Sequence, residues 1–162
     1  MGKTRLDYEI YRRGLATSRE KAKAIIIAGK VKVNGVKIDK PGTNVNEIDD
    51  IQIEAPPKYV SRGGFKLEQA ISDFKLDFSN KVVLDVGAST GGYTDCALQN
   101  GASKVYALDV GYGQLDWKLR NDERVVNIER TNIRYFTLDD LGEKVDLVTI
   151  DVSFISTAKV FP

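Results

Sequence analysis

The chain has 162 residues, enough for one ordinary domain or two small ones, and its 42% hydrophobic content is typical of a folded protein. It contains one cysteine, Cys96, and no histidine, which excludes an internal disulfide and the usual histidine-based catalytic triads and argues against a zinc site. The net charge is only +1, but residues 1–40 carry eleven Lys/Arg and four Asp/Glu (+7), whereas residues 61–162 carry twelve and fifteen (−3).

This uneven charge predicts a polyanionic partner for the front of the chain, although a solvated lysine-rich surface would give the same composition. The longest purely apolar run is residues 24–28, far below the roughly 20 residues that cross a bilayer. The first residues lack the apolar core of a signal peptide. We therefore expect a cytoplasmic protein that does not contact a membrane.

Two short helices are predicted near the start. Leu6 and Ile10 indicate a first helix that ends near Gly14. Thr17 and Glu20 have the spacing of a capping box, with Thr17 as the cap of a second helix. That helix should end at Gly29 and bury Ala22, Ile25 and Ile26.

A β-hairpin is predicted over residues 31–38, because Asn34-Gly35 lies between alternating apolar residues and both turn positions must accept a positive φ. Its strands should turn Lys32 and Lys37 outward and four apolar side chains toward a core: Val31, Val33, Val36 and Ile38. Residues 51–53 are predicted to form a closing strand, so we expect this region to fold as two helices packed on a small sheet.

A boundary follows at Pro56-Pro57, since proline cannot donate a ladder hydrogen bond and restrains the residue before it. We predict a domain over residues 1–54, a stiff linker over 55–60 and a second domain over 61–162.

Strands and helices alternate in the second domain, which predicts a parallel sheet with helices on its faces. A first helix should bury Leu67, Ala70, Ile71 and Phe74. Strands are expected at 81–86, 104–108, 125–128 and 145–150, and helices at 93–100, around 114–120 and, as a short one, near Leu138.

The segment after the first of these strands has the composition of a ligand-binding turn. Residues 85–92 read Asp-Val-Gly-Ala-Ser-Thr-Gly-Gly, and glycines let a backbone approach a ligand closely. The pattern is not the G-x-G-x-x-G of dinucleotide sites, and Asp85 just upstream would repel a pyrophosphate but suit an ammonium group. Asp109 closes the next strand, where an acid can accept ribose hydroxyls. A glycine turn required only for packing is the alternative.

Asp151 ends the fourth strand, and ligands of open α/β sheets lie beyond the carboxyl ends of the strands. Asp85, Asp109 and Asp151 should therefore converge on one crevice, although Asp151 could instead be a turn or cap residue. Residues 61–67 read Ser-Arg-Gly-Gly-Phe-Lys-Leu. A purely structural interpretation fits them too, with Ser61 as the cap of the following helix and Lys66 as a surface lysine.

Taken together, the motifs resemble the TlyA family, in which an S4 RNA-binding domain precedes an FtsJ-like methyltransferase domain that modifies ribosomal RNA at a ribose 2′-hydroxyl. The resemblance covers nearly the whole chain. Its motifs occur in the right order: residues 5–7, 18–22, 29–35, 61–67, 85–92 and 151–154. Family members often carry a hemolysin label.

The resemblance implies a small α+β S4-like domain followed by part of a Rossmann-like class I methyltransferase domain, with its first four strands. It implies S-adenosylmethionine as cofactor, no metal, and ribosomal RNA or a ribosomal subunit as partner, with cytidine as the nucleotide modified. The implied cofactor-binding residues are Asp85, Gly87, Ser89, Thr90, Gly91, Gly92, Asp109 and Asn132. The implied RNA-binding residues are Arg5, Arg12, Arg13, Arg19, Lys21, Lys23, Lys30 and Lys32.

The resemblance also implies that Lys66 and Asp151 belong to a Lys-Asp-Lys-Glu catalytic set. The second lysine and the glutamate of that set would lie beyond residue 162, because Lys159 is too close to Asp151. We therefore expect the 162-residue form not to turn over by itself. Two rival interpretations are an RNA-binding protein with a relic Rossmann-like half, and a pore-former as the hemolysin label suggests, for which we find no spanning or long amphipathic segment.

Overall fold

In a computed structural model, which describes residues 2–152, the chain divides into two compact units, Met1–Pro56 and Pro57–Pro162. No helix among these residues is long and apolar enough to span a bilayer.

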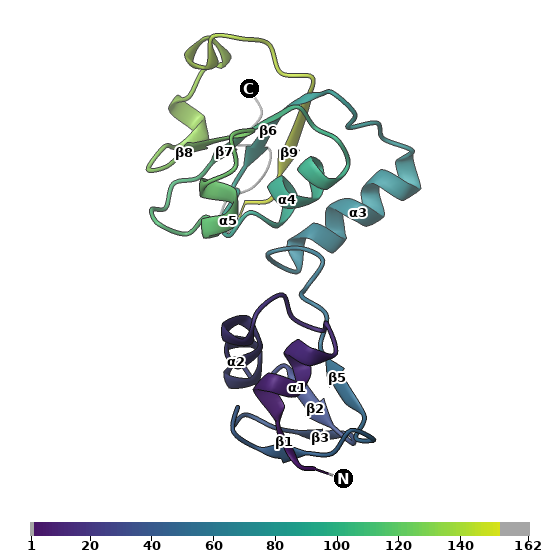
Figure 1. Cartoon of the computed structure of the whole chain (residues 1–162). Helices are drawn as coiled ribbons and strands as arrows, with labels where there is room; N and C mark the ends of the chain where they lie inside the picture. Colours follow the sequence, from purple (N-terminus) through teal and green to yellow (C-terminus); the bar gives the residue numbers. More distant parts are fainter. Residues whose placement is uncertain (1, 153–162) are drawn as a thin grey trace. The chain divides into compact units, whose positions relative to one another are not determined.

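The first unit is a small α+β fold (Figure 1). Its elements are β1 (Thr4–Arg5), α1 (Leu6–Arg12), α2 (Arg19–Ile27), β2 (Val31–Val33), β3 (Val36–Lys37), β4 (Asn44–Val45) and β5 (Ile51–Ile53). β2 is the centre of an antiparallel sheet in the order β3-β2-β5, and β1 pairs with β4. The two helices and the sheet share one core, built from Leu6, Ile10, Ala22, Ile26, Val31, Val45 and Ile51.

The predicted hairpin forms, with Asn34 at φ 48° and Gly35 at φ 81° as its turn. The expectation that Val36 faces the core is wrong, because Val36 is exposed. It belongs to β3, a two-residue strand at the edge of the sheet in which both residues are exposed. Ile25 is only half-buried, and Ala22 and Ile26 are the buried positions of α2.

The predicted cap of α2 is off by one residue. Ser18, not Thr17, is the N-cap, and its hydroxyl oxygen accepts a hydrogen bond from the Lys21 backbone amide at 3.1 Å. Two adjacent hydroxyl residues can each fill this role, so the sequence pattern could not separate them.

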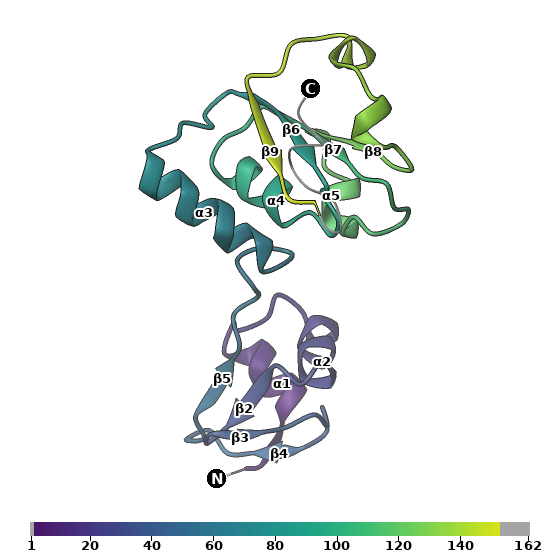
Figure 2. The same ribbon diagram turned by 180° about the vertical axis from the view of Figure 1, so that it is seen from behind.

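The second unit is an α/β fold with one parallel sheet. Its elements are α3 (Gly63–Phe74), β6 (Val82–Val86), α4 (Gly92–Gln99), β7 (Lys104–Leu108), α5 (Trp117–Arg120), β8 (Val125–Ile128), η1 (Ile133–Tyr135), η2 (Leu138–Leu141) and β9 (Leu147–Ile150). The strand order is β8-β7-β6-β9, with every neighbouring pair parallel, as the alternating pattern predicted. Figure 2 shows the same sheet from behind.

Successive strand residues point to opposite sides of the sheet, so each face has its own set of apolar side chains. Other elements of the unit cover both faces. Val83 and Val105 pack on one face with Leu67 of α3 and Leu119 of α5. Leu84 and Tyr106 pack on the other face with the η1 and η2 segment.

Three predicted details of this unit differ in the structure. Phe74 is exposed, because it is the last residue of α3 and lies beyond the packed part of the stripe. α5 is a single turn at Trp117–Arg120, without the preceding residues from 114. The short helix near Leu138 is a 3₁₀ turn.

Candidate functional site

The carboxyl ends of three strands lie level with one another. Val86, the last residue of β6, is in register with Leu108 of β7 and with Ile150 of β9. The residues that follow these strands are Gly87, Asp109 and Asp151. The chain continues from β6 to β7 and β8 on one side and returns to β9 on the other, so this is the point of order reversal where α/β sheets bind ligands.

A cavity of about 430 Å³ opens at this point. It is lined by Val86, Gly87, Ser89, Leu108, Asp109, Val110, Gln114, Asn132, Ile133, Asp151 and Val152. Of the residues predicted to bind a cofactor, four lie on its wall: Gly87, Ser89, Asp109 and Asn132. Asp151, predicted as catalytic, lines it as well. The volume is in the range of small-molecule sites.

Asp85 does not join the other two acids on the wall, and the expected convergence of three carboxylates is wrong in this respect. Its carboxylate is buried and accepts hydrogen bonds from the hydroxyls of Thr94 at 2.8 Å and Thr149 at 3.0 Å. Burial raises the pKa of Asp85 to about 6, against the lowering effect of the two hydroxyl donors. The side chain thereby connects β6 with α4 and β9 beneath the site.

Thr90, Gly91 and Gly92 are also absent from the cavity wall, and their contacts are within the protein. The carbonyl of Thr90 accepts the Asp116 amide at 2.9 Å. A Cβ on Gly91 would lie 2.3 Å from a methyl group of Leu119. The packing alternative weighed for this glycine turn therefore describes these positions better than ligand contact does.

Gly92 lets the start of α4 approach the start of α3 at contact distance. A Cβ at Gly92 would lie 2.2 Å from the Ser61 hydroxyl oxygen and 2.7 Å from the Gly64 amide nitrogen. Gly64 in turn has no space for a side chain, since a Cβ there would lie 2.3 Å from the ring of Tyr59. The two glycine-rich motifs of this unit are therefore in direct contact.

Gly87 is required by two independent constraints. Its φ of 78° is one that residues with a side chain rarely adopt. A Cβ would also lie 2.3 Å from the carbonyl oxygen of Asp151. This close approach brings the ends of β6 and β9 together at the edge of the cavity.

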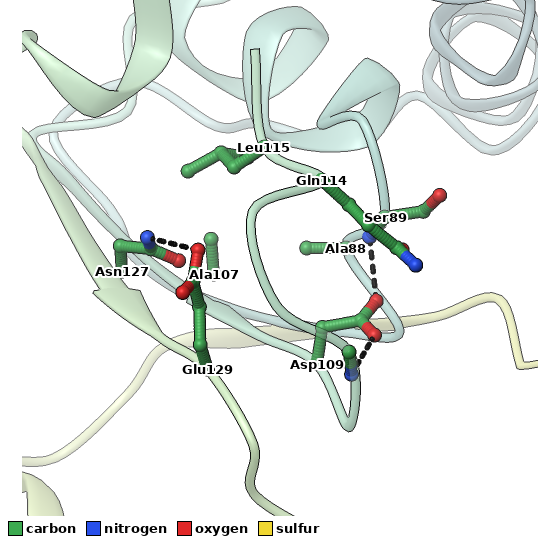
Figure 3. A pocket seen from close by; sticks show the side chains of 9 residues that line it. Ala88, Ser89, Ala107, Asp109, Gln114, Leu115, Asn127 and Glu129 are labelled. Carbon is green, nitrogen blue, oxygen red and sulfur yellow. Dashed lines mark hydrogen bonds between the residues drawn. The ribbon is translucent and has the colours of Figure 1, made fainter. Parts of the chain in front are cut away.

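The carboxylate of Asp109 is held by two backbone amides (Figure 3). Ser89 donates to Oδ2 at 2.7 Å and Gly111 donates to Oδ1 at 2.8 Å. Each carboxylate oxygen can accept a further hydrogen bond, so both remain available to a pair of ligand hydroxyls. The residues drawn in Figure 3 line a small pocket between the Asp109 loop and the Asn127–Glu129 pair. This pocket has room for about one water.

Lys66 reaches the site from α3. Its Nζ lies 3.8 Å from Oδ2 of Asp151, and the two side chains are 68% and 49% exposed. An exposed pair of this kind contributes little to stability. Lys159, the other lysine considered for the catalytic set, lies outside the described residues.

The sequence reasoning missed several residues of the cavity, chiefly Gln114 and the apolar side chains Val110, Ile133 and Val152. Val110 and Val152 each follow an aspartate at the end of a strand, and this position could have predicted that they line the cavity. Gln114 lies in a loop and Ile133 begins the 3₁₀ turn η1, and no local pattern indicates the path of either segment.

All four predicted RNA-binding arginines surround two buried acids of α1. Asp7 accepts from Arg5 at 3.1 Å and Arg19 at 3.2 Å, and Glu9 accepts from Arg12 and Arg13, each at 2.7 Å. Side-chain hydrogen bonds from Arg12 and Arg13 lower the pKa of Glu9 to about 2 although burial opposes them.

Arg13 differs from the other three arginines. Its guanidinium also donates to the backbone carbonyls of Asn46, Glu47 and Asp49, which gives it a structural role in joining α1 to the 46–49 loop. The predicted lysines lie at the surface: Lys23 pairs with Glu20 and Lys30 with Glu54, and Lys21 and Lys32 are exposed. Among residues 2–152, no three or more carboxylate or cysteine groups are arranged to hold a metal ion.

Comparison with known proteins matches residues 4–51 to the S4 domain and residues 59–162 to the FtsJ-like methyltransferase family. The chain is 52% identical over 99% of its length to the "Putative rRNA methyltransferase YqxC" of Bacillus subtilis, and 48% identical over 99% to the "16S/23S rRNA (cytidine-2'-O)-methyltransferase TlyA" of Mycobacterium tuberculosis. It covers 58% and 60% of these relatives.

A solved structure, "Putative hemolysin from Streptococcus thermophilus", superposes on this chain with a TM-score of 0.63 at 44% identity. The matched region covers 99% of this chain and 60% of the solved chain. The matched regions coincide with the α+β fold that carries the arginines and with the parallel sheet that carries the cavity. The chain belongs to the FtsJ-like methyltransferase family and carries an S4 domain ahead of its methyltransferase fold.

Proposed function

We propose that this chain supplies the RNA-binding module and the cofactor cavity of an S-adenosylmethionine-dependent methyltransferase that acts on a cytidine ribose 2′-hydroxyl of ribosomal RNA. One observation carries the proposal: the cavity at the ends of β6, β7 and β9 is bordered by Asp109 and Asp151, and Lys66 lies beside Asp151. The names of the relatives support the choice of RNA and nucleotide.

The composition of the cavity wall fits S-adenosylmethionine. Leu108, Val110 and Ile133 offer an apolar surface for the adenine, and Asp109 has acceptor capacity for the ribose hydroxyls. Two carboxylates also suit a ligand that carries a sulfonium and an ammonium group. Gly87, Ser89 and Asn132 add uncharged groups to the wall, which such a cation tolerates.

Lys66 and Asp151 supply the chemistry on the RNA side. When bound, S-adenosylmethionine provides an activated methyl carbon, so placing the ribose oxygen in line with it is most of the catalysis. A 2′-hydroxyl is a weak nucleophile. A lysine beside it takes the hydroxyl proton when the lysine is a neutral amine, and it stabilises the developing oxyanion when it is an ammonium. Asp151 orients the ammonium of Lys66, which lies within 3.8 Å.

The first unit holds the RNA through its cationic side chains. Arg5, Arg12 and Arg19 are pinned by buried acids yet remain partly exposed, so they can contact phosphates without first losing side-chain freedom. Such binding should weaken steeply as salt is raised. Ribosomal RNA as the substrate places the protein in the cytoplasm.

Calorimetry with S-adenosylmethionine tests the cofactor part. The wild-type chain should release or absorb heat on binding, and D109N should bind at least tenfold more weakly, because the amide offers one acceptor oxygen instead of two. D139N, in the exposed η2 turn, is the matched control. No binding by an intact wild-type fold would favour the relic interpretation.

A second experiment tests the reaction. The protein encoded by the complete reading frame is incubated with ribosomal subunits and labelled methyl donor, and the nucleosides are analysed by mass spectrometry. The expected product is 2′-O-methylcytidine. Label on a base instead of a ribose would overturn the assignment.

A further inference from the structure

Helix α1 exposes two aromatic side chains on one face. Tyr8 and Tyr11 are 45% and 49% exposed, whereas Leu6 and Ile10 of the same helix are fully buried. Residues three apart on a helix lie on the same face, so both side chains project from one side of α1. Exposed tyrosines set among arginines are unexplained by the packing of this unit.

The two rings border an open cavity of about 360 Å³. Its other wall is the start of α2, with Thr17, Ser18 and Arg19. The guanidinium carbon of Arg19 lies 6.0 Å from the centroid of the Tyr8 ring. The cavity therefore combines aromatic surface, hydroxyl groups and one cation.

Arg19 is fixed in this position. Its Nε donates to Oδ2 of Asp7, and Asp7 is completely buried and also accepts two hydrogen bonds from Arg5. The cation at the cavity edge is thus held by an acid that cannot move to solvent. A preorganised cation beside an aromatic surface costs little entropy to use for binding.

We propose that this cavity is a subsite for an unpaired nucleotide of RNA, whose base stacks on Tyr8 or Tyr11 and whose phosphate contacts Arg19. The inference rests on the proposed function and adds a preference within it. Phosphate contacts alone cannot separate paired from unpaired RNA, whereas an aromatic surface binds a base only when that base has left the helix stack. The net charge of +7 over residues 1–40 favours RNA over a protein partner as the occupant.

Two RNAs of equal length and charge test the preference: a hairpin with an unpaired loop, and a fully paired duplex. We compare the wild-type chain with Y8L/Y11L, with Y8F/Y11F, which keeps the rings, and with F74L, which removes an exposed aromatic in the other unit. Y8L/Y11L should bind the hairpin at least tenfold more weakly and the duplex within twofold of wild type. Y8F/Y11F and F74L should match wild type on both RNAs.

The outcomes separate this inference from the proposed function. If wild type binds both RNAs and Y8L/Y11L binds them as wild type does, or loses both equally, the stacking subsite is overturned and RNA binding stands. If wild type binds S-adenosylmethionine but neither RNA, the result contradicts both this inference and the RNA-binding part of the proposed function. If Y8L/Y11L loses ribosomal subunits but not the free hairpin, the tyrosines face a protein and the inference is overturned.

Photocrosslinking locates the contact directly. A hairpin with 5-iodouridine in its loop is irradiated with the wild-type chain and digested with trypsin, which cuts after Arg5 and Arg12 and releases Leu6–Arg12 with both tyrosines. We expect the uridine adduct on this peptide. Adducts confined to other peptides would contradict a base on Tyr8 or Tyr11.

Discussion

Lys66 of α3 and Asp151 at the end of β9 are brought to 3.8 Å at the edge of the cavity, although the three strands β6, β7 and β8 and the helices α4 and α5 come between α3 and β9 in the chain. The pair is exposed, so removing it should cost little stability. We expect its removal to lower the rate of methyl transfer instead.

K66A and D151N in the protein encoded by the complete reading frame should therefore lower the methyl-transfer rate by about 10²-fold or more, since a positioned proton-transfer group contributes of that order. K66A should bind S-adenosylmethionine within twofold of wild type, because Lys66 is not on the cavity wall. K144A removes another exposed lysine and is the control. An active K66A would refute the role of this lysine.

G87A should destabilise the second unit and abolish cofactor binding. The new Cβ would meet the Asp151 carbonyl and force apart the ends of β6 and β9. Gly142 also has a φ above 70° but nothing within 4 Å of a Cβ, so G142A carries the backbone strain without the collision. In urea unfolding we expect a loss of about 2–4 kcal/mol for G87A and about 1 kcal/mol for G142A. Equal losses would show that the collision is relieved by a small shift.

Asp85 should make stability depend on pH in an unusual direction. Its pKa is raised by burial to about 6, so between about pH 4 and 6 the folded state holds a proton that the unfolded state has released. The free energy of unfolding that Asp85 contributes then falls as pH rises through this window.

Unfolding curves of wild type and D85N over pH 4–7 measure this contribution as a difference. The advantage of wild type over D85N should shrink up to about pH 6 and then stay constant. The advantage of wild type over D77N should be constant over this range, because the Ser79 backbone amide holds the pKa of Asp77 below its usual value and the group therefore titrates below about pH 4. Parallel curves for wild type and D85N would contradict the assignment.

Glu9 should protect the first unit against acid. Because Arg12 and Arg13 hold its pKa at about 2, its contribution is complete above its ordinary pKa near 4.5 and is lost as pH falls from there toward 2. E9Q should remove this contribution and lower the free energy of unfolding at pH 7 by about 1–3 kcal/mol, since two guanidiniums lose a buried partner. E47Q, an exposed neighbour of Arg12, should change it by less than about 0.5 kcal/mol. A stable E9Q would mean that the arginines find other acceptors.

The parallel sheet and the hairpin could be predicted because their signals are local. Alternating apolar strands with helices, and Asn34-Gly35 between valines, each specify one structure. The exposure of Val36 and Phe74 could not be read in this way, because it depends on where the neighbouring element ends.

The site was only partly predictable for a related reason. Strand-ending acids indicate an edge of the sheet, which located Asp109 and Asp151. Whether an acid points into the cavity depends on its partners: Asp85 precedes the end of β6, where threonines from α4 and β9 reach it. The exposure of Tyr8 and Tyr11 has no local signal, because their spacing indicates one helix face but not whether that face is covered.

The contact between Gly92 and the Ser61–Gly64 turn has a consequence for variation in this family. Gly92 starts α4, and the Ser61–Gly64 turn starts α3, which carries Lys66. Because the two segments are in contact, neither has room for a larger side chain unless the other moves. A substitution that enlarges one must be answered by a shift in the other, and that shift would carry Lys66 with it. We therefore expect related sequences in which residue size changes at one of these two motifs to show a compensating change at the other.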